Sequence, residues 1–338
     1  MSKKIGFVGL GTMGFPMAIN LKKAGFDVIG YDAFKGVYEK ATSEGITMVG
    51  TLKEVAEQAD EAIISMVRDY KQNVEIIFND NGLLSAQPKE KTIIVMSTLD
   101  PDTMNQLSQK VEQESNFTLI DASVSGGASG AKDGTLSIMT SGPEEIVKSF
   151  QPYFDAIGSK TFYYGEKTGN SQAAKLINNL ILGINMNAVA EGLKLAENYN
   201  LPQEELLELF KVSTGDSWVV RNWNDISEWT AETALDVLQK DLMSAYDQGV
   251  KHHVSLPFNA LASTLLFDSM GKEKAIQILN PLIKVCSKGR HHTFRTPLIH
   301  ITYSILYFHF SLFHILILNK FLLLNLHSLF FLQKNFEK

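Results

Sequence analysis

Three glycines near the start of the chain limit the local fold more than any other feature of the sequence. Residues 4–8 form a short apolar run, and a helix-like stretch covers residues 18–24. A strand, a glycine turn and a helix in this order suit dinucleotide binding, because the glycines allow the tight turn, the approach of a pyrophosphate and close helix packing. The phosphates then lie at the helix N-terminus. The pattern predicts a nucleotide-binding turn at Gly9, Leu10, Gly11, Thr12, Met13 and Gly14.

A carboxylate after the second predicted strand indicates which dinucleotide binds. The strand covers residues 27–31, and Asp32 follows it, 21 residues after Gly11. A carboxylate here accepts hydrogen bonds from the adenosine ribose hydroxyls and repels a 2′-phosphate, which favours NAD over NADP. Lys35 lies close in the sequence and keeps NADP possible. The simpler alternative is that Asp32 is a solvated turn residue.

Strands and helices continue to alternate after this unit. Strands are predicted at 61–67 and 92–96, and helices at 51–59, 71–78 and 101–114. This alternation predicts an α/β fold with a doubly wound parallel sheet of Rossmann type over residues 1–165, with ligands beyond the carboxyl ends of the strands. Met66, Val67 and Thr98 end such strands, so we expect them to line the cofactor cleft. The alternative is that they are ordinary loop residues.

A glycine-rich turn follows the strand predicted at 117–122. Ser125, Gly126 and Gly127 present backbone N–H groups and one hydroxyl at the strand end. Such a turn can hold an anion, and a carboxylate substrate would fit it. The alternative is a glycine loop that only reverses the chain before the next strand, at 135–140.

Residues 171–198 predict one long helix that joins the sheet to an all-helical domain at 166–285. The segment has no proline, and Ser171 is a possible N-cap. It is apolar on nearly every face, so we expect it to be buried. Lys175 and Asn179 are four residues apart and share one face. A buried lysine has a lowered pKa and is paired or functional, unless its side chain reaches solvent.

Four ordered motifs together resemble a known family. Residues 9–18, 121–127 with 134–136, 169–179 and 240–242 are similar in order and spacing to the β-hydroxyacid dehydrogenases, the 3-hydroxyisobutyrate dehydrogenase group, and the match covers residues 3 to about 285. Residues 214–218 and 256–258 most resemble its L-threonate dehydrogenase branch. Two positions depart from the family pattern: Ser123 stands where proline is usual, and Ser171 where glycine is usual.

The resemblance implies an NAD-dependent oxidation of a short hydroxy acid such as L-threonate or 3-hydroxyisobutyrate. It implies that Lys175 is the catalytic acid/base, that Asn179 and residues 125–127 hold the substrate, and that Lys240 lies near the nicotinamide. The chemistry agrees, because hydride transfer requires removal of the alcohol proton and a lysine of lowered pKa can take it. Trp218 is expected to shape the substrate pocket, unless it only packs in a core. The alternative function is a catalytically silent NAD(P)-binding module.

Composition limits the partners and the compartment. The chain has 338 residues, a net charge of −6 and a single cysteine, Cys286. This charge argues against a nucleic-acid partner, and the lone cysteine favours a reducing compartment. The N-terminus carries no signal-like or mitochondrial targeting pattern, so we expect a cytoplasmic protein. No metal-ligand cluster is evident. The apolar long helix predicts a homo-oligomer, a dimer or a tetramer.

The last 53 residues differ in composition from the rest. Residues 286–338 hold six of the eight histidines, and residues 298–318 carry no charge, a length that could span a bilayer. Three histidines in that run argue against a membrane anchor. We interpret residues 286–338 as an atypical hydrophobic tail, a mispredicted or read-through terminus, with a membrane anchor or a folded element as the alternatives.

Overall fold

The structure is a computed structural model that describes residues 2–86, 90–230 and 234–269. The described residues all belong to one compact unit. The predictions made for the tail lie outside the described residues.

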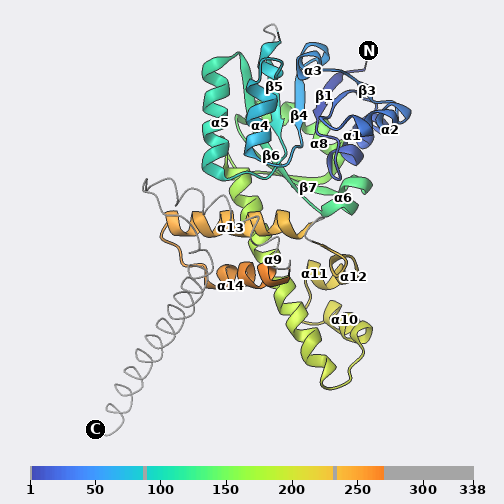
Figure 1. The fold of residues 1–338 in the computed structure, drawn as a ribbon, viewed down its shortest axis with the longest axis vertical. Coiled ribbons are helices and arrows are strands. Elements are labelled where there is room, and N and C mark those ends of the chain that lie inside the picture. The colour runs from blue at the N-terminus through green and yellow to red at the C-terminus, as the bar shows by residue number, and fades with distance from the viewer. Residues whose placement is uncertain (1, 87–89, 231–233, 270–338) are drawn as a thin grey trace, which may run out of the picture. The chain divides into compact units, whose positions relative to one another are not determined.

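An eight-stranded sheet forms the first part of the chain, in the order β3-β2-β1-β4-β5-β6-β7-β8 (Figure 1). The strands from β1 to β6 are parallel, which confirms the predicted sheet, whereas β7 runs antiparallel to β6 and β8 parallel to β7. Strand β6 extends three residues beyond the predicted end, so Ser125 belongs to the strand. The strands are β1 Lys4–Val8, β2 Asp27–Tyr31, β3 Thr47–Met48, β4 Ala62–Ser65, β5 Lys91–Val95, β6 Phe117–Ser125, β7 Leu136–Ser141 and β8 Gly158–Tyr163.

Helices cover both faces of this sheet, as a doubly wound fold requires. One core packs α1 and α8 on one face, around Met17 and Phe154, and a second core packs α3, α4 and α5 on the other, around Val55 and Leu107. The helices are α1 Gly14–Lys23, α2 Tyr38–Ser43, α3 Leu52–Gln58, α4 Tyr70–Phe78, α5 Pro101–Glu114, α6 Gly127–Asp133, α7 Glu144–Ser149 and α8 Gln151–Ile157, with 3₁₀ turns at Lys35–Val37 and Leu83–Ser85.

Helix α9, Asn170–Glu197, leaves the sheet and carries the helical part of the chain (Figure 1). Leu242 of α13 packs onto Gly183 of α9, where an added Cβ would lie 2.9 Å from the leucine side chain. A side chain at 183 would therefore push the two helices apart. The helices after α9 are α10 Gln203–Lys211, α11 Trp218–Arg221, α12 Trp223–Ile226, α13 Leu235–Lys251 and α14 Pro257–Ser269.

Two expectations for the long helix were wrong. The N-cap is Gly169, with a φ of 97°, and Ser171 is a fully buried residue of the first turn. The helix is not buried on every face, because Ile177 and Ile181 are 60% and 51% exposed. The physical reason is that the elements packed against α9, namely the sheet, α5, α10, α11, α13 and α14, leave this side of the helix uncovered. Within the described ranges, no helix is long and apolar enough to cross a membrane.

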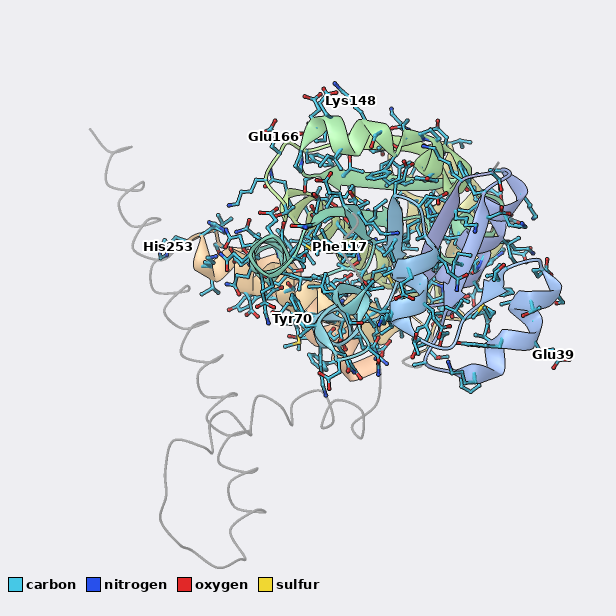
Figure 2. The ribbon with its side chains drawn as sticks, turned by 90° about the horizontal axis from the view of Figure 1, so that it is seen from above. Glu39, Tyr70, Phe117, Lys148, Glu166 and His253 are labelled. Atoms are coloured by element: carbon cyan, nitrogen blue, oxygen red, sulfur yellow. The ribbon has the colours of Figure 1, made fainter. Side chains whose placement is uncertain are left out.

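Many charged side chains lie at the periphery, as Figure 2 shows for Glu39 on α2 and Lys148 on α7. His253, after α13, is exposed and has a φ of 57°, so it ends the helix in a left-handed conformation. Left-handed residues commonly end helices.

Candidate active site

The three glycines of the first turn have different steric roles. Gly9 has a φ of +94°, and a Cβ there would lie 2.5 Å from the carbonyl oxygen of Met66. A Cβ on Gly14 would lie 1.9 Å from the carbonyl oxygen of Gly9. By contrast, a Cβ on Gly11 would meet nothing within 4 Å. Gly9 and Gly14 therefore let the chain pack on itself, whereas Gly11 leaves the open space that a pyrophosphate needs.

Asp32 is joined to this turn. Its Oδ2 accepts the N–H of Leu10 at 2.6 Å, and its Oδ1 accepts the N–H of Phe34 at 2.7 Å. Each carboxylate oxygen keeps further acceptor capacity, so the side chain can still bond ribose hydroxyls. Lys35 Nζ lies 4.5 Å from the centre of the Tyr31 ring and 2.6 Å from the Tyr38 hydroxyl. The structure thus places the Asp32 carboxylate beside the glycine turn, and the Lys35 ammonium group contacts Tyr31 and Tyr38.

The other predicted cofactor residues lie around the same edge of the sheet. The carbonyl oxygen of Met66 and a methyl of Val67 would contact a Cβ on Gly9, so both residues pack over the turn. Lys240 on α13 donates from Nζ to the carbonyl oxygen of Thr98 at 2.7 Å. This bond joins the end of β5 to the helical part. The helical part of the chain is therefore bonded directly to the edge of the sheet where the glycine turn lies.

Lys175 lies on α9 with its side chain half-buried. Burial lowers the pKa of Lys175 to about 8, Lys240 lowers it further, and the carboxylate of Asp241 opposes the shift. A lysine with this pKa exists in both protonation states near neutral pH, so it can give or take a proton.

Asn179, four residues after this lysine on α9, forms a buried pair with Asp241 of α13. Asn179 Nδ2 donates to Oδ2 of Asp241 at 2.6 Å, and both residues are buried. Lys240 Nζ lies 3.3 Å from the other carboxylate oxygen. Asp241 of α13 therefore joins the predicted pair of Lys175 and Asn179. Its carboxylate accepts a hydrogen bond from Asn179, and its charge raises the pKa of Lys175.

The Ser125-Gly126-Gly127 segment lies at the end of β6, beside α9. Asn178 Nδ2 lies 3.3 Å from Ser125 Oγ, which links the two elements. Gly126 and Gly127 have φ values of 135° and 67°, which non-glycine residues rarely adopt. A Cβ on Gly127 would meet nothing within 4 Å, so there is open space over this backbone. The segment can therefore offer unhindered N–H groups to a small anion.

Trp218 lies in the helical part of the chain. It begins α11, is 43% exposed, and has its ring centre 6.5 Å from that of Trp229. Its neighbours Val219 and Val220 pack in one cluster with Val189 of α9. Val189 is fourteen residues after Lys175, roughly 21 Å along a helix. The structure therefore places Trp218 beside the cluster that joins α11 to α9, and its expected role in shaping the substrate pocket stays a prediction.

A buried polar cluster below the start of α9 was missed at the sequence level. Asp121 of β6 accepts the N–H of Gly169 at 3.1 Å and of Gln172 at 3.3 Å. Burial raises the pKa of Asp121 to about 6, although the Ser141 hydroxyl and these N–H groups act in the opposite direction. The Gln172 side chain accepts from Leu99 N at 2.9 Å and donates to Ser97 O at 3.1 Å. A carboxylate inside an apolar strand, and a glutamine three residues before Lys175, were the available signals.

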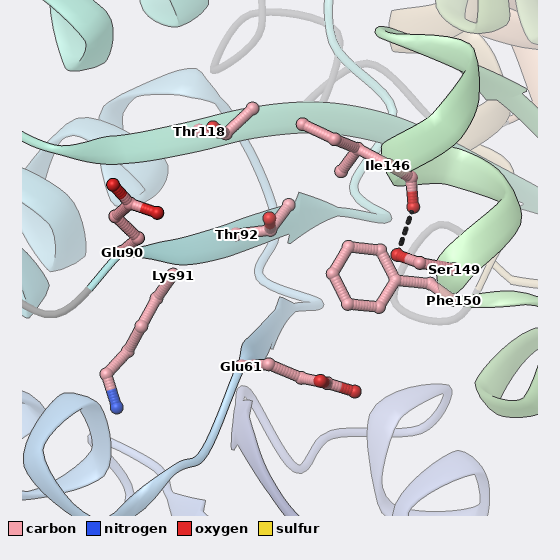
Figure 3. Close-up of a pocket in the computed structure, with 8 residues that line it drawn as sticks. All are labelled: Glu61, Glu90, Lys91, Thr92, Thr118, Ile146, Ser149 and Phe150. Atoms are coloured by element: carbon pink, nitrogen blue, oxygen red, sulfur yellow. Dashed lines mark hydrogen bonds between the residues drawn. The ribbon is translucent and has the colours of Figure 1, made fainter.

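A separate hollow of about 240 Å³ lies at the opposite ends of the strands (Figure 3). It is lined by Glu61, Lys91 and Phe150, among others. Glu61 accepts from Lys3 Nζ at 2.7 Å and from the Tyr153 hydroxyl at 2.8 Å, and Lys91 donates to the carbonyl of Ala59. These side chains already have partners, and the hollow is remote from the glycine turn. Within the described part of the chain, no group of His, Cys, Asp or Glu could hold a metal ion.

The fold and the glycine turn define a dinucleotide-binding protein. Residues 4–165 match the family model of the NAD-binding domain of 6-phosphogluconate dehydrogenase. Residues 169–276 match the model described as NAD-binding of NADP-dependent 3-hydroxyisobutyrate dehydrogenase. The chain belongs to the β-hydroxyacid dehydrogenase family and is an NAD(P)-dependent oxidoreductase.

Relatives support this placement. The 2-(hydroxymethyl)glutarate dehydrogenase of Eubacterium barkeri is 32% identical over 289 residues, 84% of this chain and 95% of that protein. The L-threonate dehydrogenase of Cupriavidus necator is 30% identical, over 78% of this chain and 89% of that one. The crystal structure of 3-hydroxyisobutyrate dehydrogenase from Salmonella typhimurium matches with a TM-score of 0.71 and 25% identity, over 79% of this chain and 94% of that chain.

Proposed function

We propose that this enzyme oxidises a short hydroxy acid with NAD and that Lys175 removes the hydroxyl proton. The observation that carries the proposal is the half-buried Lys175 with a pKa of about 8, one helical turn before Asn179. When bound, NAD supplies the hydride acceptor. The residues of the chain then have to hold the acid, orient its hydroxyl and accept one proton at Lys175 Nζ.

The substrate is held, in this proposal, at its carboxylate by the Ser125-Gly126-Gly127 segment. The positive φ values and the open space over Gly127 leave its backbone accessible to an anion. Each of the three relatives is named for a hydroxy acid, namely 2-(hydroxymethyl)glutarate, L-threonate or 3-hydroxyisobutyrate. A carboxylate and an alcohol are the features common to these acids. This panel is therefore the first choice of substrates, with L-threonate and 3-hydroxyisobutyrate preferred from the sequence.

The preference for NAD over NADP rests on Asp32. Its carboxylate is held by the N–H groups of Leu10 and Phe34 at 2.6 and 2.7 Å, so turning the side chain away would break both bonds. A 2′-phosphate at that position would meet a negative charge. The expected measurement is a higher kcat/KM with NAD than with NADP, and a higher value with NADP would reject this assignment.

The assignment of Lys175 is tested with a matched lysine from the same helix. The Lys175→Ala variant should lose at least about 100-fold in kcat, because general acid/base catalysis contributes about that much. Lys194, an exposed lysine in the last turn of α9, provides the control variant Lys194→Ala. NAD binding is measured for both variants by fluorescence titration. Near-normal turnover of Lys175→Ala with NAD bound normally would contradict the assignment.

We also propose that the enzyme is a homo-oligomer, a dimer or a tetramer. Ile177 and Ile181 lie four residues apart on α9 and are 60% and 51% exposed. Two adjacent branched apolar side chains in water favour burial against a partner. Light scattering with size-exclusion chromatography measures the mass, and the Ile181→Lys variant should lower it if this face is an interface. A wild-type monomer would reject the proposal.

A further inference from the structure

We propose that Ser123 and Ser171 act as a positioning pair that sets the position of Lys175 relative to the Ser125-Gly126-Gly127 segment. The inference rests on the proposed function, because it assigns a role to contacts below the catalytic lysine and the substrate segment. Neither serine is placed against substrate or cofactor. They act through the backbone of β6 and α9.

Two hydrogen bonds and a close approach of the two hydroxyls join the serines. Ser123 N–H donates to Ser171 Oγ at 3.0 Å, and Ser123 Oγ donates to the carbonyl oxygen of Ser171 at 3.0 Å. The two hydroxyl oxygens are 2.6 Å apart. Ser171 Oγ also donates to the carbonyl oxygen of Met139 on β7 at 2.6 Å. Both serines are fully buried, so these bonds do not compete with water.

Each serine precedes the group that it would position by one period of its element, two residues in β6 and four residues in α9. Ser125 follows Ser123 by two residues, so both side chains project from the same face of β6. Lys175 follows Ser171 by four residues, so both lie on the same face of α9. Two strand residues advance about 6.7 Å and four helix residues about 6 Å, which are similar steps. A shift between Ser123 and Ser171 is thus passed on to Ser125 and Lys175.

The surrounding contacts hold the start of α9 without the pair. Ser141 Oγ accepts the N–H of Ser171 at 3.0 Å, and the Asp121 carboxylate accepts the N–H groups of Gly169 and Gln172. Removal of one serine hydroxyl should therefore leave α9 packed on the sheet but change its position relative to β6. Loss of the Ser171 hydroxyl leaves the buried Ser123 N–H without its acceptor, which a small movement of the two elements would relieve.

The test compares four variants of the full chain. Ser171→Ala and Ser123→Ala each remove one hydroxyl, and a double variant completes the cycle. Ser108→Ala is the matched control, because Ser108 is a buried serine whose hydroxyl lies 3.4 Å from the carbonyl oxygen of Leu119 on the same strand, away from the segment at 125–127. Steady-state kinetics with the best hydroxy acid of the panel are measured together with NAD affinity and the melting temperature.

A positioning role predicts that Ser171→Ala lowers kcat/KM for the hydroxy acid at least about tenfold, because small misplacements of reacting groups cost about this much or more. NAD affinity should stay within about twofold, since the glycine turn is not involved. The double variant should lose less than the product of the two single losses. The Ser108→Ala control should keep its kcat/KM.

Two results would overturn the inference. One is a fall in melting temperature for Ser171→Ala with kcat/KM unchanged, which is what a purely structural bond gives. The other is independent, multiplicative losses in the double variant. Ser123→Ala keeps the N–H bond to Ser171 Oγ, so it remains informative where Ser171→Ala does not fold. If the wild-type enzyme oxidises none of the acids, the proposed function fails instead, and the two failures are distinguishable.

Discussion

The amide of Asn179 donates from Nδ2 to the carboxylate of Asp241 at 2.6 Å, and this bond joins α9 to α13 in the interior. The Asn179 Oδ1 accepts from Asn178 Nδ2 at 3.2 Å. Because a carboxylate only accepts, the bond fixes which end of the Asn179 amide faces Asp241. These two bonds leave one amide hydrogen of Asn179 and part of the acceptor capacity of its oxygen unused.

The Asp241→Asn variant should move the pH dependence of the reaction. The negative charge of Asp241 raises the pKa of Lys175 against the effect of burial. Its removal should lower that pKa, so the inflection in the kcat–pH profile should move below about 8. The measurement is kcat at saturating acid and NAD between pH 6 and 10. Asp247→Asn, an exposed carboxylate on the same helix, is the control. An inflection that stays in place or rises would contradict the prediction.

The wild-type oxidation rate should rise with pH up to about 8. The pKa of Lys175 is lowered to about 8, and only its neutral form can take the alcohol proton. Below that pH, kcat should fall about tenfold per pH unit, and above it the rate should level off. In the reverse direction the protonated lysine is the acid, so reduction should show the opposite slope. Equal slopes in both directions would exclude Lys175 as the titrating group.

Relative to an asparagine variant, the buried Asp121 should contribute more stability at acidic pH than at neutral pH. Its folded pKa is raised to about 6 from 3.8, so between these values the folded state holds more protons than the unfolded state. The stability of the wild type should therefore fall as pH rises towards about 6, by at most about 3 kcal/mol from this group. Thermal melts of wild type and Asp121→Asn are compared at pH 5 and 7.5. The melting temperature of the wild type minus that of the variant should be more positive at pH 5 than at pH 7.5. The opposite order would contradict the raised pKa of Asp121.

Two glycines of the first turn should respond differently to alanine. Gly14→Ala places a Cβ 1.9 Å from the Gly9 carbonyl oxygen, so the turn must shift and the unliganded protein should lose stability. Gly11→Ala meets nothing within 4 Å, so it should fold normally and weaken NAD binding by at least about tenfold through a clash with the pyrophosphate. Gly192→Ala, in open space on α9, is the control. Unchanged NAD affinity in Gly11→Ala would place the pyrophosphate elsewhere.

The sequence by itself determined the elements whose signals are local. The glycine spacing predicted the turn between β1 and α1, and Asp32 at the end of β2 is held against that turn as the pattern requires. The four-residue spacing of Lys175 and Asn179 placed them on one face of α9, because helix periodicity depends only on neighbours along the chain.

Only the tertiary structure decided the contacts between distant elements. Asp241 bonds Asn179 from a helix 62 residues away, and Ser123 bonds Ser171 across 48 residues. The exposed side of α9 and the reversed direction of β7 also depend on which elements pack beside them. No spacing within a segment encodes such contacts, since they arise from the path of the whole backbone. That path places a buried carboxylate against Asn179 and determines how α9 sits on the sheet.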